Sequence, residues 1–462
     1  MNTHYDFIAI GGGSAGYNGA RAATEHAERV AVVDGAPELG GLCILKGCMP
    51  SKTLLYVAEV LHRAKHGERL GLQIPSALPD MNRVAERKRR IIGEFADYRA
   101  RQINSGNYTV YRSFARFVGP NEIELSDGAR LTADRFLIGT GSVVSTPPIP
   151  GLRESKAWTS DDILDLDFVP ESVIVLGGGI VAAELTQYLG RMGSRITLIQ
   201  RSPHILRHHS PEAAQVIETA LRDDGIEVIT GTHLDQVAFD GSEYTVRFSE
   251  AGQPRVRRAR HLFNALGRSP NTGKLNLEAV GVDRRENGQI VASEFQQTTA
   301  AHIYAAGDCT GPNEIVHIAI AQAEIAVRHA FGRPTDPIDT SKQVDVVFTD
   351  PQLARLGLAA AELDEQGIEY VSASYPFDDH GKAILMEATY GYVKVLADPG
   401  YGRILGAEIV GRDAGELIHI FSTVIAMNGT AADMLKASWY HPTLAEIITY
   451  PLEEIVEKIG VS

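Results

Sequence analysis

The sequence predicts an α/β protein in which one strand–turn–helix–strand unit occurs twice and an antiparallel region follows. Two glycine-rich turns, Gly11–Gly16 and Gly177–Ala182, each come directly after a short apolar run. Each turn precedes a helical stretch and then a second apolar run. From about residue 341 the pattern changes to short strands followed by helices. This order indicates two units built on parallel sheets and a C-terminal α+β unit.

The first unit begins with a buried strand at Phe7–Ile10. The glycine turn follows, then a helix from Tyr17 to about Glu28 and a second strand, Val30–Val33, which ends at Asp34. In such a unit the helix N-terminus binds a pyrophosphate and the acid binds a ribose hydroxyl. The pattern alone is also compatible with an ordinary turn, but its context predicts a dinucleotide site. The residues expected to bind the dinucleotide are Gly11, Gly13, Ser14, Gly16 and Asp34.

The second unit repeats the first with the same internal offset. Gly11 and Asp34 are 23 positions apart, and so are Gly177 and Gln200. The second copy ends in the uncharged Gln200, and Arg201 and Arg207 follow. A carboxylate would repel a 2′-phosphate, whereas an arginine accommodates one, so we expect this site to prefer NADP(H). The alternative is that both arginines are solvated loop charges. The residues expected to bind this second dinucleotide are Gly177, Gly179, Gln200, Arg201 and Arg207.

Two cysteines, Cys43 and Cys48, lie five positions apart in a chain that has three cysteines in 462 residues. Five steps along an ideal helix advance about 7.5 Å, more than the ~4.4–6.8 Å usual between bridged Cα atoms. The backbone must therefore depart from a helix, and Gly47 and Pro50 suit that. We expect a redox-active pair. Unreactive thiols are an alternative, and half a zinc site is disfavoured because no second pair exists.

Composition limits the function classes. The chain is 44% hydrophobic and 22% charged, with a net charge of −14, so a nucleic-acid-binding protein is disfavoured. No apolar run is long enough to span a membrane, and the N-terminus lacks the pattern of a cleavable leader. With few cysteines as well, a cytoplasmic location is the default expectation.

In this order the motifs resemble the FAD-dependent pyridine nucleotide-disulfide oxidoreductases, which include dihydrolipoyl dehydrogenase, glutathione reductase and mercuric reductase. The resemblance runs from Tyr5 to the last helix. Besides the turns and the cysteines, it rests on Gly139–Ser142, Ala265–Asn271, Ile303–Asp308, Phe348–Pro351 and His441–Glu446. It implies two Rossmann-like dinucleotide-binding domains and a C-terminal α+β dimerisation domain.

The resemblance divides the chain into four parts. Residues 1–147 would begin the FAD-binding domain, 148–267 would bind NAD(P), 268–340 would complete the FAD-binding domain, and 341–462 would form the dimerisation domain. A proline-rich stretch around Pro148 marks the expected hinge into the second part. Strands are expected in the last part at Val344–Phe348, Tyr392–Leu396 and Ile404–Val410.

The resemblance also implies residue roles. Cys43 would exchange with substrate and Cys48 would lie nearest the flavin. Lys52 would lie at the flavin's reactive edge, paired with Glu184. His441, oriented by Glu446, would transfer the proton at the dithiol of the other subunit of a homodimer. Further residues expected to contact cofactor are Gly41, Gly141, Gly267 and Asp308. Cys309 has no implied role, and we expect it to be a small packed residue.

Three departures bear on the substrate. The sequence of the cysteine segment is nearer that of the lipoamide branch of the family, whereas Arg201 and Arg207 are nearer the residues of the NADPH-using branches. Trp439 stands where dihydrolipoyl dehydrogenases commonly carry a second histidine. The first glycine turn starts at residue 11, so we expect no N-terminal metal-binding domain, and the last residues contain no cysteine pair. We therefore expect mercury reduction to be disfavoured.

The expected function is electron transfer between a dithiol or disulfide and NAD(P), through FAD and a Cys43–Cys48 disulfide. The substrate expected first is a dihydrolipoyl or lipoyl group, with a lipoyl-carrying protein as a candidate partner. One alternative is an NADPH-dependent disulfide reductase similar to glutathione reductase. Others are an NAD(P)H oxidase or transhydrogenase that uses flavin alone, and a redox-responsive binding protein.

Overall fold

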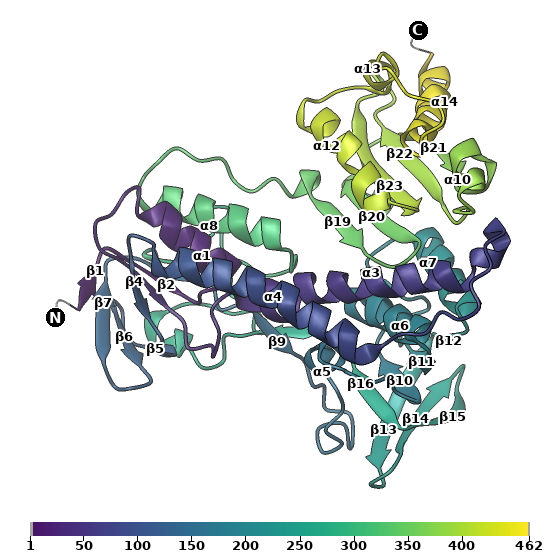
Figure 1. Ribbon diagram of the computed structural model, residues 1–462. Helices are drawn as coiled ribbons and strands as arrows, with labels where there is room; N and C mark the ends of the chain where they lie inside the picture. Colours follow the sequence, from purple (N-terminus) through teal and green to yellow (C-terminus); the bar gives the residue numbers. More distant parts are fainter. Residues whose placement is uncertain (1–2, 461–462) are drawn as a thin grey trace. The chain divides into compact units, whose positions relative to one another are not determined.

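The computed structural model describes residues 3–460, which form two compact units (Figure 1). The first unit contains the chain up to Leu54, Met81–Ser145 and Gly267–Ile338. The second contains Leu55–Asp80, Thr146–Leu266 and the chain from Asp339 onward. Each unit has helices packed on sheets, as the sequence predicts.

A five-stranded parallel sheet is the centre of the first unit. Its strand order is β18 (Ile303–Ala305), β8 (Phe136–Ile138), β2 (Phe7–Ile10), β3 (Val30–Val33) and β4 (Thr109–Tyr111). Residues of β2 and β3 are all buried, as expected for strands covered on both faces. Figure 1 shows helix α1 (Ser14–Ala23) beside helix α8 (Val316–Ala330), and the two helices are in contact.

Helix α1 is displaced along the chain from its expected position. It begins at Ser14, directly after the glycine turn, and it ends at Ala23 rather than near Glu28. Beyond it the Thr24 hydroxyl donates a hydrogen bond to the Arg21 carbonyl, 2.7 Å away. Thr24 therefore satisfies a carbonyl at the helix end, and the chain turns toward β3.

The remainder of the first unit comprises two smaller sheets and three helices. One sheet has the order β1 (His4–Tyr5), β7 (Arg130–Ala133), β6 (Glu122–Leu125) and β5 (Ala115–Gly119), and the other pairs β9 (Ser142–Val144) with β17 (Arg268–Pro270). The helices are α2 (Gly41–Lys46), the start of α3 (Cys48–Lys65) and α4 (Met81–Asn104).

The second unit contains the other glycine turn. Its parallel sheet has the order β12 (Glu227–Ile229), β11 (Arg195–Ile199), β10 (Ser172–Leu176) and β16 (His261–Asn264). Helix α6 (Ile180–Met192) follows β10, and α7 (Pro211–Asp223) follows β11. An antiparallel sheet, which the sequence analysis missed, is formed by β13 (Thr232–Phe239), β14 (Tyr244–Glu250) and β15 (Gln253–Ala259).

The C-terminal part of the second unit is built on a five-stranded antiparallel sheet. Its order is β19 (Val344–Val347), β20 (Gln352–Gly357), β23 (Ile404–Gly411), β22 (Tyr392–Ala397) and β21 (Val371–Pro376). Three of these strands are those predicted, and β20 and β21 are additional. Helices α12 (His419–Ala426) and α14 (Thr449–Ile459) contribute Phe421 and Leu452 to its core. No helix within residues 3–460 combines the length and hydropathy needed to cross a bilayer.

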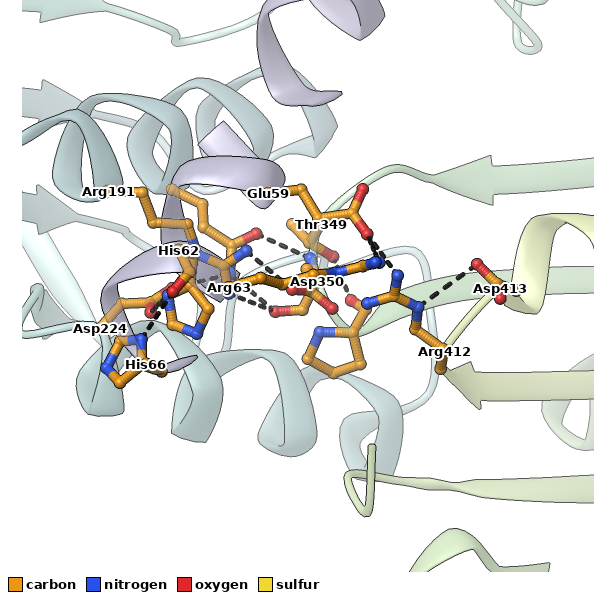
Figure 2. Close-up of polar contacts among 12 residues, drawn as sticks. Glu59, His62, Arg63, His66, Arg191, Asp224, Thr349, Asp350, Arg412 and Asp413 are labelled. Atoms are coloured by element: carbon orange, nitrogen blue, oxygen red, sulfur yellow. Dashed lines mark hydrogen bonds and ion pairs between the residues drawn. The ribbon is translucent and has the colours of Figure 1, made fainter. Parts of the chain in front are cut away.

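A buried polar cluster joins α6 to the segment before β20 (Figure 2). The Arg191 guanidinium donates at 2.8 Å to Asp224 and at 2.8 Å to Asp350. Gln187 donates to the Asp350 carbonyl at 2.8 Å and accepts from the Asp350 amide at 2.7 Å. His62, on α3, lies 3.2 Å from the Asp224 carboxylate. These contacts fix the polar face of α6 against the rest of the second unit.

Candidate active site

The two cysteines lie on either side of a break between two helices. Helix α2 ends at Lys46 and α3 begins at Cys48, because Gly47 adopts φ −136° and ψ −116°. A Cβ added to Gly47 would lie 3.0 Å from the Leu42 carbonyl oxygen and 3.2 Å from the Cys43 Cα. The predicted departure from an ideal helix is therefore present. It brings the two half-buried thiols within reach of one another.

The neighbouring thiol controls the protonation of Cys43. A hydrogen bond with Cys48, followed by burial and the charge of Cys48, raises the pKa of Cys43, and the positive charge of Lys52 opposes this only weakly. Two sulfurs this close titrate as a coupled pair, so a second negative charge is strongly disfavoured. The raised pKa favours the thiol form of Cys43, so a base is needed to draw its proton away.

The cysteine segment lies directly against the first glycine turn. Gly41 adopts φ +75°, and a Cβ added there would lie 2.6 Å from the Gly13 Cα. Only glycine permits that approach of two backbones. The fold thus places the sulfur pair beside the predicted dinucleotide site within the same unit.

The first glycine turn fits the ADP half of FAD. Gly11 adopts φ +107°, and a Cβ on Gly16 would lie 1.8 Å from the Gly11 carbonyl oxygen, so the turn requires both glycines. The amide of Gly12 donates to the Asp34 carboxylate at 3.1 Å. The N-terminus of α1 and the carboxylate at the end of β3 thus lie together, as binding of a pyrophosphate and a ribose requires.

A polar cluster lies at the end of β18 in the first unit. Ser142 donates to Asp308 at 2.6 Å, and Arg268 donates to the Ser142 hydroxyl at 2.7 Å. Burial and the charge of Asp308 raise the pKa of Glu314, which Arg268 opposes. Gly141 and Gly267, the other predicted contacts, adopt φ values of +66° and +110°. Sequence reasoning did not identify Glu314, because nothing in its local pattern marks it.

Cys309 is fully buried next to this cluster. Its thiol donates to the Ala306 and Ile138 carbonyls at 3.3 and 3.4 Å. Burial, and to a lesser degree the charge of Asp308, raises the pKa of Cys309 to about 12. Cys309 is therefore an inert packed thiol.

The second glycine turn has the same backbone shape as the first. Gly177 adopts φ +107°, and Gly179 caps α6 with φ −76° and ψ −175°. Gln200 is 9% exposed, and its side chain lies next to Gly178. Arg201 and Arg207 are both exposed, and the Arg207 Nε donates to the His208 Nε2 at 3.0 Å. The turn fits a second dinucleotide, and both arginines are accessible to a ligand.

His441 and Glu446 form a hydrogen-bonded pair in the second unit. The His441 Nδ1 lies 2.9 and 3.1 Å from the two Glu446 carboxylate oxygens. The His441 side chain is 78% exposed, whereas that of Glu446 is 13% exposed. A carboxylate on Nδ1 leaves Nε2 free to take or give a proton.

The expected pairing of Lys52 with Glu184 stays a prediction, because the two residues belong to different units. Glu184 is 3% exposed, and one of its carboxylate oxygens accepts a hydrogen bond from the Phe348 amide at 2.9 Å. The same division applies to the cysteine pair and His441. Sequence reasoning also missed His380, which lies behind Glu446 at an Nε2–Oε1 distance of 3.6 Å.

Comparison with known proteins identifies relatives that cover nearly the whole chain. A mercuric reductase from Lysinibacillus sphaericus is 33% identical over 444 residues, which is 96% of this chain and 81% of the relative. A dihydrolipoyl dehydrogenase from Bacillus subtilis (strain 168) is 29% identical over 464 residues, 97% of each chain. Among solved structures, LpdA from Mycobacterium tuberculosis has a TM-score of 0.87 at 26% identity, covering 97% of this chain and 99% of that one.

Two family models match consecutive parts of the sequence. The model for the dimerisation domain of the pyridine nucleotide-disulphide oxidoreductases matches residues 344–451, which indicates a homodimer. The model for the pyridine nucleotide-disulphide oxidoreductases themselves matches residues 5–330, well over half of the 462 residues. This chain therefore belongs to that family of flavin-dependent enzymes, for which FAD and NAD(P) are the implied cofactors.

Proposed function

We propose that this enzyme moves electron pairs between NADP(H) and a dithiol or disulfide substrate, and that a dihydrolipoyl or lipoyl group is that substrate. The observation that carries the proposal is the contact of Cys43 and Cys48 beside the first glycine turn. When bound, FAD would pass electron pairs between the nicotinamide and these sulfurs. The first glycine turn, Asp34 and Asp308 would hold it.

In the dehydrogenase direction the reaction begins with the Cys43–Cys48 disulfide. A substrate thiol gives its proton to His441, and the resulting thiolate attacks the Cys43 sulfur. The Cys43–Cys48 bond breaks, a mixed disulfide forms at Cys43, and Cys48 leaves as a thiolate. The second substrate sulfur then attacks the mixed disulfide and closes the substrate disulfide, and its proton passes to the Cys43 sulfur, which is released as a thiol. The substrate loses two electrons and two protons, and the sulfur pair gains the electrons.

The protonation of Cys43 fits its role as the exchanging sulfur. Its raised pKa favours the thiol once the disulfide is open, which leaves the negative charge on Cys48. In the reductase direction Cys43 must lose that proton before it can attack. The partner subunit's His441 would accept it, and Glu446 would stabilise the imidazolium that forms. The proton acceptor is therefore needed in both directions.

The preference for NADP(H) is proposed from the end of β11. Gln200 brings no negative charge, and Arg201 and Arg207 are accessible for a 2′-phosphate. Substituting both arginines with alanine should reduce kcat/KM for NADPH by at least about tenfold and leave that for NADH unchanged. A chain that prefers NADH without any substitution would contradict the proposal.

Mercuric-ion reduction is a second candidate, because relatives at 31–34% identity are named mercuric reductases. Two of the three cysteines are the half-buried pair, and Cys309 is fully buried. Mercuric ion would therefore have to be taken directly by Cys43 and Cys48. NADPH oxidation that depends on mercuric ion and exceeds turnover with every disulfide would favour this candidate.

The test begins with anaerobic titration of the FAD-loaded protein by NADPH and by NADH. Turnover is then measured with lipoamide, a lipoyl-carrier protein, glutathione disulfide and mercuric ion. Cys43→Ser and His441→Gln should each lower disulfide turnover by at least about a hundredfold. Reduction of ferricyanide by NADPH, which needs only the flavin, should be unchanged. Disulfide turnover at the normal rate in either variant would contradict the proposal.

A further inference from the structure

A second histidine lies behind the His441–Glu446 pair. His380 is the N-cap of helix α10 (Gly381–Leu385), and its Nε2 lies 3.6 Å from the Glu446 Oε1. The three side chains pass from solvent into the core: His441 is 78% exposed, Glu446 13% and His380 1%. The carboxylate of Glu446 thus lies between two imidazoles, one on the surface and one in the core.

Neither ring nitrogen of His380 has a hydrogen-bond partner among residues 3–460. A buried polar group left without a partner lowers stability, so its presence needs a reason. The 3.6 Å separation from Glu446 exceeds a normal hydrogen bond. A shift of the carboxylate by about 0.5 Å would bring the two atoms within bonding range.

The aromatic residues near His380 leave the Glu446 carboxylate as the hydrogen-bond partner of its ring. The Tyr450 and His380 rings pack edge to face, with a centroid distance of 6.2 Å and an interplanar angle of 80°. Tyr375 stacks on Tyr450 at 4.0 Å, and its hydroxyl donates to the Asp379 carboxylate at 2.9 Å. The Tyr375 hydroxyl is therefore engaged elsewhere, while the Glu446 carboxylate faces the His380 ring.

The surroundings of His380 favour its neutral form. Burial lowers the pKa of His380, the nearby His441 lowers it further, and Glu446 acts in the opposite direction. A neutral imidazole carries one N–H and can donate it to a carboxylate without cancelling the negative charge. Its tautomer with the proton on Nε2 has the donor that faces Glu446.

We propose that His380 is a positioning residue for the proton-transfer pair: it donates from Nε2 to Glu446 and holds that carboxylate in line with His441. This inference rests on the proposed function. When His441 takes a proton from a thiol, Glu446 must stay ionised and aligned to stabilise the imidazolium. A largely buried carboxylate with no donor on its inner side would tend to protonate or turn toward solvent.

Two substitutions with side chains of similar length distinguish the effect of the hydrogen-bond donor at position 380 from the effect of side-chain volume. His380→Gln keeps an N–H at the distance of Nε2, whereas His380→Met fills the same space without a donor. In the FAD-loaded homodimer, His380→Met should lower kcat/KM by about tenfold. The substrate is lipoamide, or whichever disulfide the wild type turns over fastest. His380→Met should also move the acid limb of the kcat/KM profile to lower pH by roughly one unit, because the imidazolium loses alignment with its counter-charge. His380→Gln should restore both quantities, and ferricyanide reduction should be unchanged in both variants.

The inference requires that His380 act through Glu446. In a Glu446→Gln background, His380→Met should therefore cause no further loss of disulfide turnover. If His380→Met fails to bind FAD, His380→Asn replaces it, because the shorter Asn amide does not extend to the position of Nε2. This variant should show the same tenfold loss in kcat/KM for the disulfide, with normal ferricyanide reduction.

An unchanged pH profile in the variant that lacks the donor, or full additivity with Glu446→Gln, would overturn the role of His380. If His441→Gln itself kept normal disulfide turnover, the proposed function would fail instead. The two failures are thus distinguishable.

Discussion

The two glycine turns share a backbone but differ in what surrounds it. Gly11 and Gly177 both adopt φ +107°, and Gly13 and Gly179 cap their helices with ψ values of −168° and −175°. The residue after the strand that follows each helix packs its side chain against the second glycine of the turn. This side chain is the carboxylate of Asp34 in the first copy and the amide of Gln200 in the second. The shared geometry suits any dinucleotide. The difference in the side chain is what can select between two cofactors.

The copies also differ at the sixth and last position of the turn and along the helix. The first has Gly16 where the second has Ala182, so one turn excludes a methyl group that the other accommodates. Arg21 at the end of α1 is exposed, whereas Arg191 at the end of α6 is buried and paired with two carboxylates. Both turns pack tightly on backbone at their first glycine, and the second copy adds buried ion pairs at the far end of its helix.

The largest expected effect comes from placing a methyl group at the last position of the first turn, residue 16. In Gly16→Ala the Cβ would lie 1.8 Å from the Gly11 carbonyl oxygen, and backbone cannot move aside cheaply. We expect a loss of more than about 4 kcal/mol in unfolding free energy, together with loss of bound FAD. Flavin content and denaturant unfolding measure both. The matched change Ala182→Gly should cost only about 1 kcal/mol, through helix propensity. Equal effects of the two substitutions would contradict the comparison.

The next effect comes from removing the buried cation of α6. Arg191→Met leaves Asp224 and Asp350 without their shared partner (Figure 2). Breaking a buried pair on one side should lower the unfolding free energy by about 3 kcal/mol. Arg21→Ala on α1 is the control, because Arg21 is 61% exposed and lies 3.7 Å from Glu324, and it should change stability by less than about 0.5 kcal/mol. A comparable loss in both variants, measured by urea unfolding, would show that the buried cluster has no special weight.

A smaller effect concerns the acid stability of the same cluster. Burial acts against ionisation of Asp224, but His62, Gln187 and Arg191 together outweigh it, so the pKa of Asp224 is lowered from 3.8. A carboxylate with a lowered pKa contributes stability above its unfolded value and loses it as pH falls through the folded value. As pH falls from 5 through 3.8 toward the lowered folded pKa, the wild type should therefore lose more unfolding free energy than Asp224→Asn. Unfolding at a series of pH values checks this, and parallel curves for the two proteins would refute it.

The features that could be predicted from sequence are those in which neighbours along the chain determine the structure. The glycine turns and the break at Gly47 follow from backbone sterics within a few residues, so residue type and spacing predict them. Helix α1 was misplaced by three residues at its start because the sequence pattern does not show that Gly13 is its cap. The second unit's antiparallel sheet was missed because β15 is mostly exposed and has little hydrophobic pattern.

Non-local contacts account for the rest of the candidate site. His380 lies behind Glu446 although the two are 66 positions apart (446 − 380), and its own segment has no catalytic pattern. Arg191 likewise pairs with Asp350, 159 positions away along the chain. Such pairs depend on how sheets and helices pack, and no single stretch of sequence contains that information. The cysteine pair could be predicted because both sulfurs and the glycine between them are local.

The smallest expected effect bears most directly on the difference between the copies. Gln200→Glu places a carboxylate in the second copy where Asp34 stands in the first, and only the charge changes because the two side chains have nearly the same volume. A negative charge next to a 2′-phosphate should lower kcat/KM for NADPH by about tenfold, which is 1.4 kcal/mol. The value for NADH should be kept or rise, because a carboxylate can accept from both ribose hydroxyls. Steady-state rates with each nucleotide, on protein with full FAD content, measure the ratio. If the ratio of NADPH to NADH did not move, residue 200 would not be the discriminating position, and the arginines that follow it would have to carry the preference alone.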